Sequence, residues 1–115
     1  MLLEFTCANF RSINHKCTLS LRAQSILDEP KANVLQINKN VKVLKTAALY
    51  GANSSGKSNI IKAFLSMIYH IVESVKLNDD DELDFEPFRL TTIKNKPTFF
   101  EVIFILIFHR FDIIV

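Results

Sequence analysis

The chain has 115 residues, of which 49% are hydrophobic and 23% charged, and a formal net charge of +2 at pH 7. This length suits one domain, and this composition is sufficient for a packed interior, which excludes a disordered protein. The first residues lack the basic n-region of a signal peptide, and the longest apolar run, residues 102–108, is far shorter than the roughly 20 residues of a membrane span. A cytoplasmic protein without a membrane partner is therefore expected.

The charges are unevenly distributed. Residues 1–78 carry ten Lys and Arg against four Asp and Glu, whereas residues 79–86 carry six acids and no base. The basic part could serve nucleotide phosphates or nucleic acid, although Lys and Arg at this density more often form plain solvated surface. The acidic stretch lacks the glycine of a calcium-binding loop, so we expect an exposed loop there.

The two cysteines, Cys7 and Cys17, are separated by nine residues. With no second pair nearby, they match neither a zinc-ligand spacing nor a disulfide framework. Both are expected to be reduced thiols.

The N-terminal half of the chain has the alternating pattern of β-strands. Residues 2–10 and 15–23 alternate apolar with polar side chains, and the short link between them favours an antiparallel hairpin. Residues 24–40 indicate a connection with a short helical or extended piece. Residues 41–50 alternate at first and then become continuously apolar, which predicts a strand that enters a buried centre.

The second half begins with the clearest pattern in the chain. From residue 59 to residue 77, apolar side chains recur at the 3.6-residue period of an amphipathic helix. The polar stretch 78–87 ends it. Residues 97–108 are rich in aromatic and β-branched side chains and predict a mostly buried strand.

Gly51 and Gly56, the only two glycines of the chain, are the first and sixth residues of a phosphate-loop motif. The sequence from Gly51 to Ser58 matches GxxxxGK[ST] and lies between the predicted buried strand and the predicted helix. Glycines allow the backbone to turn its amides toward a phosphate, and the helix N-terminus adds the positive end of its dipole. Lys57 is suited to the β- and γ-phosphate oxygens, and the Ser58 hydroxyl to Mg²⁺. The alternative is a simple glycine turn that joins a strand to a helix beside a solvated lysine.

Around this motif the chain resembles a known family. "FTCANFRSI" at residues 5–13, "YGANSSGKSN" at residues 50–59 and "EPFRL" at residues 86–90 are similar to the N-terminal end of prokaryotic AAA/ABC-type ATPases of the overcoming-lysogenization-defect class. These ATPases are relatives of the recombination and chromosome-maintenance ATPases, and many act in phage defence or with nucleases. The resemblance covers residues 1 to about 106. It implies an α/β fold, namely the N-terminal part of a P-loop NTPase domain with an antiparallel hairpin, a P-loop strand and a long helix.

The resemblance also assigns candidate roles. Arg11 becomes a candidate contact for a phosphate or the ribose, although a surface arginine at a strand end is an equal alternative. Asn53 matches a loop asparagine that orients either the attacking water or the loop itself. Many relatives have glycine at the position of Ser54, although alanine or serine is also seen there, and backbone strain at this position is one hypothesis. The predicted site for ATP and Mg²⁺ comprises Gly51, Ala52, Asn53, Ser54, Ser55, Gly56, Lys57, Ser58 and Asn59, with Arg11 beside it and Ser58 as the metal ligand.

Binding of phosphates is not hydrolysis. The family supplies a Mg²⁺-holding aspartate and a signature segment farther along the chain, and neither is found here; Asp112 follows an apolar run that His109 and Arg110 interrupt. Residues 1–115 are therefore interpreted as one incomplete P-loop ATPase domain, truncated or frame-shifted, with no catalytic residue assigned and enzymatic activity left open.

Two other functions remain open. The first is a non-catalytic remnant that acts as an interaction module, as a homodimer or by pairing with a full-length ATPase, since uncovered strand edges invite association and poor solubility. The second is nucleic-acid binding, which the lack of aromatic residues interleaved with the basic patch disfavours.

Overall fold

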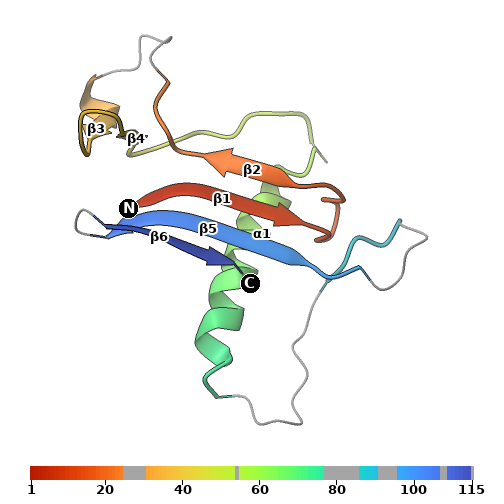
Figure 1. The fold of residues 1–115 in the computed structure, drawn as a ribbon. Helices are drawn as coiled ribbons and strands as arrows, with labels where there is room; N and C mark the ends of the chain where they lie inside the picture. Colours follow the sequence, from red (N-terminus) through yellow and green to blue (C-terminus); the bar gives the residue numbers. More distant parts are fainter. Residues whose placement is uncertain (25–30, 54, 77–85, 91–95, 107–108, 115) are drawn as a thin grey trace.

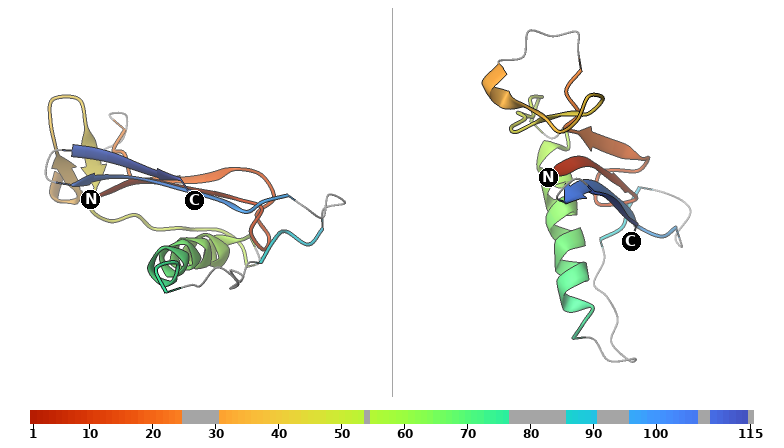
Figure 2. Two further views of the ribbon diagram at one scale, coloured as in Figure 1. Left: turned by 60° about the horizontal axis from the view of Figure 1, so that its bottom comes forward. Right: turned by 60° about the vertical axis from the view of Figure 1, so that its left-hand side comes forward.

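The computed structural model describes residues 1–24, 31–53, 55–76, 86–90, 96–106 and 109–114. It contains a four-stranded sheet in the order β2-β1-β5-β6 and a separate two-stranded ribbon of β3 and β4. The helix α1 crosses one face of the larger sheet (Figures 1 and 2). The elements are β1 (Leu2–Ala8), β2 (Cys17–Ser20), η1 (Lys31–Asn33), β3 (Val34–Gln36), β4 (Lys42–Leu44), α1 (Lys57–Glu73), β5 (Phe99–Leu106) and β6 (His109–Ile114).

The first two strands form the predicted antiparallel hairpin. They pair in a register that sets Cys7 opposite Cys17. In β1 the alternate side chains Phe5 and Cys7 are buried in the cluster that includes Ala63 and Met67 of α1, because residues two apart in a strand point to the same face. The hairpin prediction is confirmed.

The strand predicted over residues 97–108 is found as β5 over Phe99–Leu106, but it is less buried than predicted; residues 107 and 108 lie outside the described residues. It pairs antiparallel with β1 on one side and with β6 on the other. Because both edges are paired, β5 is a central strand, and its side chains Phe100 and Val102 are buried. Its aromatic and β-branched residues suit such a half-buried, pleated surface.

The predicted amphipathic helix is confirmed as α1. Ala63, Met67 and His70 are its buried side chains, at the spacing of one helical face. The ring of Phe64 meets that of Phe5 edge to face, with the centroids 5.1 Å apart. Such a contact contributes about 1 kcal/mol beyond the area that it buries. This packing fixes the start of α1 over the β1–β2 hairpin.

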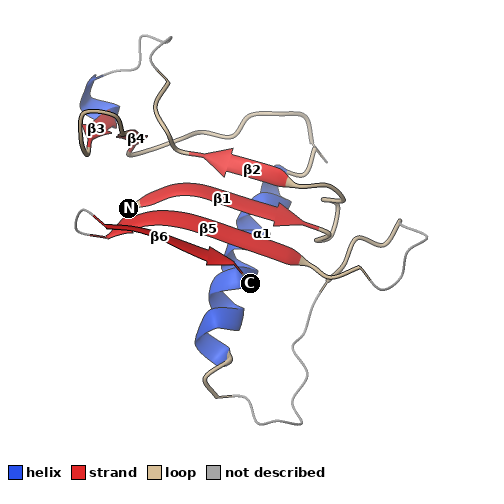
Figure 3. Cartoon of the chain, viewed as in Figure 1, coloured by secondary structure: helices blue, strands red, loops and turns tan. Residues whose placement is uncertain are grey.

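The predicted strand over residues 41–50 is wrong over most of its length. Only Lys42–Leu44 form a strand, which pairs with β3, and residues 46–50 are exposed loop (Figure 3). Tyr50 is 91% exposed. A buried strand needs neighbours that bind its backbone amides and carbonyls. Both edges of β1 are already occupied by β2 and β5, so the sheet offers residues 46–50 no place beside β1.

The described strands pair only antiparallel, so this part of the chain is a small α+β arrangement. The assignment to an α/β P-loop NTPase domain stays a prediction. The region 24–40 includes the expected short helical and extended pieces, η1 and β3, whereas the acidic residues 79–84 lie outside the described residues. In the described part of the chain, no helix combines the length and the apolar character that crossing a membrane requires.

Candidate phosphate-binding site

The glycine-rich segment leads directly into the N-terminus of α1. The helix begins at Lys57, with Gly56 as its N-cap, and no side chain caps it. The first amides of a helix have no carbonyl partner within the helix, so the amides of Lys57 and Ser58 are available to a ligand. Together with the positive end of the helix dipole, they favour an anion at this end of α1.

Both glycines are required by the shape of this loop. Gly56 has a φ of 90°, in the left-handed region where side chains are strained, and a Cβ there would lie 3.4 Å from the Ser12 hydroxyl oxygen. Gly51 has a φ of 157°, which side chains rarely adopt, and a Cβ there would lie 2.9 Å from the Ser55 hydroxyl oxygen unless that side chain rotated away. The unusual φ values that the motif leads one to expect at its glycines are therefore present.

The Lys57 side chain folds back over the loop. Its ammonium donates hydrogen bonds to the carbonyl oxygens of Gly51, at 2.6 Å, and Ala52, at 2.5 Å, and to the Ser55 hydroxyl, at 3.2 Å. An ammonium has three protons, so neutral oxygens of the loop use them all. A phosphate oxygen is a stronger acceptor because it carries negative charge. The Lys57 ammonium can therefore exchange its hydrogen bonds with the loop for stronger ones with an anionic ligand.

A hollow of about 380 Å³ adjoins this loop. That volume falls within the usual range of small-molecule sites. Its walls come from the turn after β1, from β2, from the exposed segment before the loop and from the start of α1; they are Ser12, Ile13, Cys17, Leu49, Tyr50, Gly51, Ser55, Gly56, Lys57 and Ile60. None of these residues is acidic, so the lysine is the charged group of the hollow.

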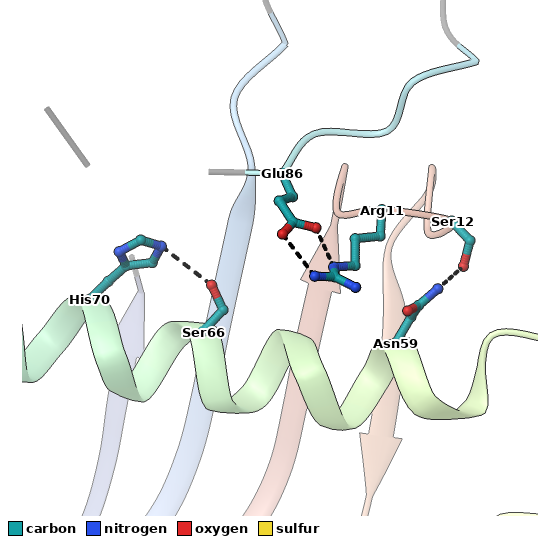
Figure 4. A network of polar contacts seen from close by, with 6 residues as sticks. All are labelled: Arg11, Ser12, Asn59, Ser66, His70 and Glu86. Atoms are coloured by element: carbon teal, nitrogen blue, oxygen red, sulfur yellow. Dashed lines mark hydrogen bonds and ion pairs between the residues drawn. The ribbon is translucent and has the colours of Figure 1, made fainter. Parts of the chain in front are cut away.

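Arg11 lies elsewhere. Its backbone amide donates to the Glu86 carbonyl oxygen at 2.9 Å, and its guanidinium forms a two-pronged ion pair with the Glu86 carboxylate, one bond of which measures 2.7 Å (Figure 4). The arginine lines two larger hollows, of about 570 and 530 Å³, and is not among the residues around Lys57. A phosphate contact by Arg11 would require this ion pair to open.

Ser12 and Asn59 connect the loop to the sheet. The Asn59 side-chain amide donates to the Ser12 hydroxyl at 2.6 Å, which ties the first turn of α1 to the turn after β1 (Figure 4). The sequence analysis did not predict a role for Ser12, although this residue lies in the quoted segment FTCANFRSI. It also did not predict the hydrogen bonds by which Asn9 connects the turn after β1 to the segments before β5. Asn9, buried and at a φ of 51°, donates to the Lys96 carbonyl oxygen and accepts from the Phe88 amide.

Two further predicted residues are exposed. Asn53 and Ser58 both face solvent, and Ser54 lies outside the described residues. The described residues hold no cluster of three or more His, Cys, Asp and Glu that would suit a metal ion. A Mg²⁺ ion here would rest on the Ser58 hydroxyl and on phosphate oxygens, a hard oxygen donor set that fits this ion.

His70 has a packing role. It is buried against the ring of Phe100, and its Nε2 atom lies 3.3 Å from the Ser66 hydroxyl (Figure 4). The larger hollow along α1 is therefore bordered by a core histidine and by the Arg11–Glu86 ion pair. It is also lined by Lys62, but the phosphate-loop motif does not border it.

No protein-family model matches the chain, and no curated protein or solved structure matches it either. The resemblance of residues 1–106 to AAA/ABC-type ATPases thus rests on the quoted motifs and stays a prediction.

Proposed function

We propose that the chain binds the polyphosphate of ATP, with Mg²⁺, through residues 51–59, as the N-terminal part of a cytoplasmic AAA/ABC-type P-loop ATPase domain. One observation carries the proposal: the Lys57 ammonium is folded over a glycine-bounded loop at the N-terminus of a helix. The motif GxxxxGK[ST] independently specifies this combination of cation, loop and helix start.

Electrostatics supports an anionic ligand at this loop. Three sources of positive potential meet here, namely the Lys57 ammonium, the unpaired first-turn amides and the dipole of α1. When a phosphate enters, the ammonium exchanges neutral acceptors for charged ones, and each such charge-assisted bond is stronger than the bond that it replaces. The released carbonyl groups of Gly51 and Ala52 are exposed and can be hydrated.

Mg²⁺ supplies charge neutralisation for the phosphates when it is bound. The Ser58 hydroxyl, in the first turn of α1, is the protein ligand in this proposal. No acid is among the described residues that line the hollow, so the proposal covers binding and assigns no hydrolysis to these residues.

The test is a titration with a fluorescent ATP analogue in the presence and absence of Mg²⁺. Wild-type protein is expected to show saturable, Mg²⁺-dependent binding. Lys57→Ala is expected to weaken it by at least about tenfold, since one charge-assisted hydrogen bond contributes about 1.5–3 kcal/mol.

Lys62→Ala is the matched control. Lys62 is an exposed lysine of the same helix that does not line the hollow, so its removal changes the net charge equally and should leave binding unchanged. Equal affinities of wild type and Lys57→Ala, or no saturable binding by folded wild type, would refute the proposal.

A further inference from the structure

The two cysteines of the chain face each other across the β1–β2 hairpin. Cys7 and Cys17 are directly opposite in the register. In the same register Leu3 is opposite Leu21, an even number of positions from each cysteine, and the Leu21 amide donates to the Leu3 carbonyl oxygen at 2.7 Å. Hydrogen-bonded pairs alternate along an antiparallel ladder, so Cys7 and Cys17 are of the same class as Leu3 and Leu21. Both thiols lie on the face toward α1.

The pair is within reach of a disulfide. Residues of a hydrogen-bonded antiparallel pair have Cα atoms about 5.5 Å apart, and disulfides span about 4.4–6.8 Å. Their Cβ atoms lie about 4.5–5.5 Å apart, whereas a relaxed disulfide holds them at about 3.8 Å. A bridge would therefore pull the strands together locally and would be more easily reduced than a structural disulfide.

The two thiols differ in access. Cys7 is completely buried in the cluster around Phe5 and Phe100, and burial, followed by the neighbouring Cys17, raises the pKa of the Cys7 thiol from 9.0 to about 11. Cys17 is only half-buried and lines the hollow beside Lys57. An oxidant that enters the hollow meets Cys17 first.

We propose that Cys7 and Cys17 are a redox pair in the wall of the phosphate-loop hollow, which a low-molecular-weight disulfide oxidises to a reversible cross-strand disulfide. The Cys17 thiolate attacks one sulfur of the small disulfide, forms a mixed disulfide and releases one thiolate. The Cys7 sulfur then attacks the Cys17 sulfur, the Cys7 proton passes to the departing small thiolate, and the second small thiol is released. Two protein thiols are oxidised by two electrons, and the small disulfide is reduced to two thiols.

The intermediate links this chemistry to the nucleotide site. A mixed disulfide on Cys17 places a bulky group in the hollow that Lys57 and Gly56 line, so the adduct and a bound nucleotide exclude each other. This step rests on the proposed function, whereas oxidation of the pair does not.

The experiment treats the folded, reduced chain with glutathione disulfide and follows the intact mass after acid quenching and alkylation. Wild type is expected to pass through a single glutathione adduct to a monomer that lacks two hydrogens, and mild dithiol should reverse the reaction. Cys7→Ala should stop at the adduct, and Cys17→Ala should react at least about tenfold more slowly, because the remaining thiol is buried. Circular dichroism checks that both variants fold. The wild-type result tests the proposal even if one of the variants does not fold.

An unmodified wild type, independent adducts on both thiols, or only disulfide-linked dimers would overturn the redox pair. A separate arm adds Mg²⁺ and ATP, which should slow formation of the adduct. If the bridge forms but ATP has no effect, the redox pair stands and the nucleotide site fails; if ATP binds but no bridge forms, the reverse holds.

Discussion

At the scale of single residues, the loop depends on one backbone conformation. Gly56 adopts a φ of 90° immediately before α1, and its position brings the loop close to the Ser12 hydroxyl. Any side chain here meets both the strain of the left-handed region and a neighbouring oxygen. The glycine is therefore as important to the fold as Lys57 is to the proposed ligand.

Replacement of this glycine should cost stability. Gly56→Ala is expected to lower the free energy of unfolding by about 1–2 kcal/mol, because alanine is strained at this φ. Urea denaturation measures the change. Ser58→Ala, an exposed position two residues later, is the control and should change stability by no more than about 0.5 kcal/mol. Equal stabilities of wild type and Gly56→Ala would show that the loop relaxes to another conformation.

Residue by residue, the sequence motif gave a good account of this loop. The glycine positions, the lysine and the helix start all follow from GxxxxGK[ST], because each is a local requirement of a loop that turns into a helix. The partner of Arg11 could not be predicted in this way. Glu86 lies 75 positions away, and no local pattern specifies a pair that the tertiary fold brings together.

At the scale of elements, the contact between α1 and the sheet holds the candidate site in place. Met67 is 2% exposed within the cluster that includes Phe5 and Phe100, whereas Leu65, on the same helix, is 59% exposed. Because α1 carries the loop at its N-terminus, loss of this packing would also release the loop from the hairpin.

This contrast gives a matched pair of substitutions. Met67→Ala should destabilise the chain by about 2–5 kcal/mol, since it leaves a cavity in the core. Leu65→Ala should cost less than about 1 kcal/mol. Thermal and urea unfolding would compare them; similar losses for the two variants would mean that the packing of α1 differs from that described.

The elements themselves were largely predictable. The strands β1, β2 and β5 and the helix α1 follow from side-chain periodicity, because each buries one face against the others. The course of residues 41–50 was not predictable, because a continuously apolar sequence shows that a segment can be buried but not which neighbouring strand would cover it.

At the scale of the whole molecule, the described residues include an exposed apolar stripe on α1. A stripe of side chains on α1 and the turn after it, spaced alternately four and three residues apart, is 41–87% exposed and comprises Ile61, Leu65, Ile68, Val72 and Val75. This is the spacing at which one helix packs against another. Contiguous exposed apolar surface of this kind favours association.

We therefore expect self-association of the isolated chain. Gel filtration with light scattering should give a mass that rises with concentration, and the double substitution Leu65→Lys and Ile68→Lys should shift it toward the monomer, because charges cannot be buried without partners. Lys62→Ala, on the same helix but outside the stripe, should leave the mass unchanged. A sharp monomeric peak for wild type at every concentration would contradict this expectation.

By itself, the sequence determined the short-range features: alternating strands, an amphipathic helix, and a glycine-bounded loop with a lysine at the helix start. These depend on residues a few positions apart, so local stereochemistry and side-chain periodicity specify them. Only the tertiary structure decided that β5 takes the second edge of β1, that residues 46–50 stay exposed, and that Cys7 meets Cys17 beside the loop. These outcomes depend on competition among distant segments for the same strand edges and core space, which no local pattern records.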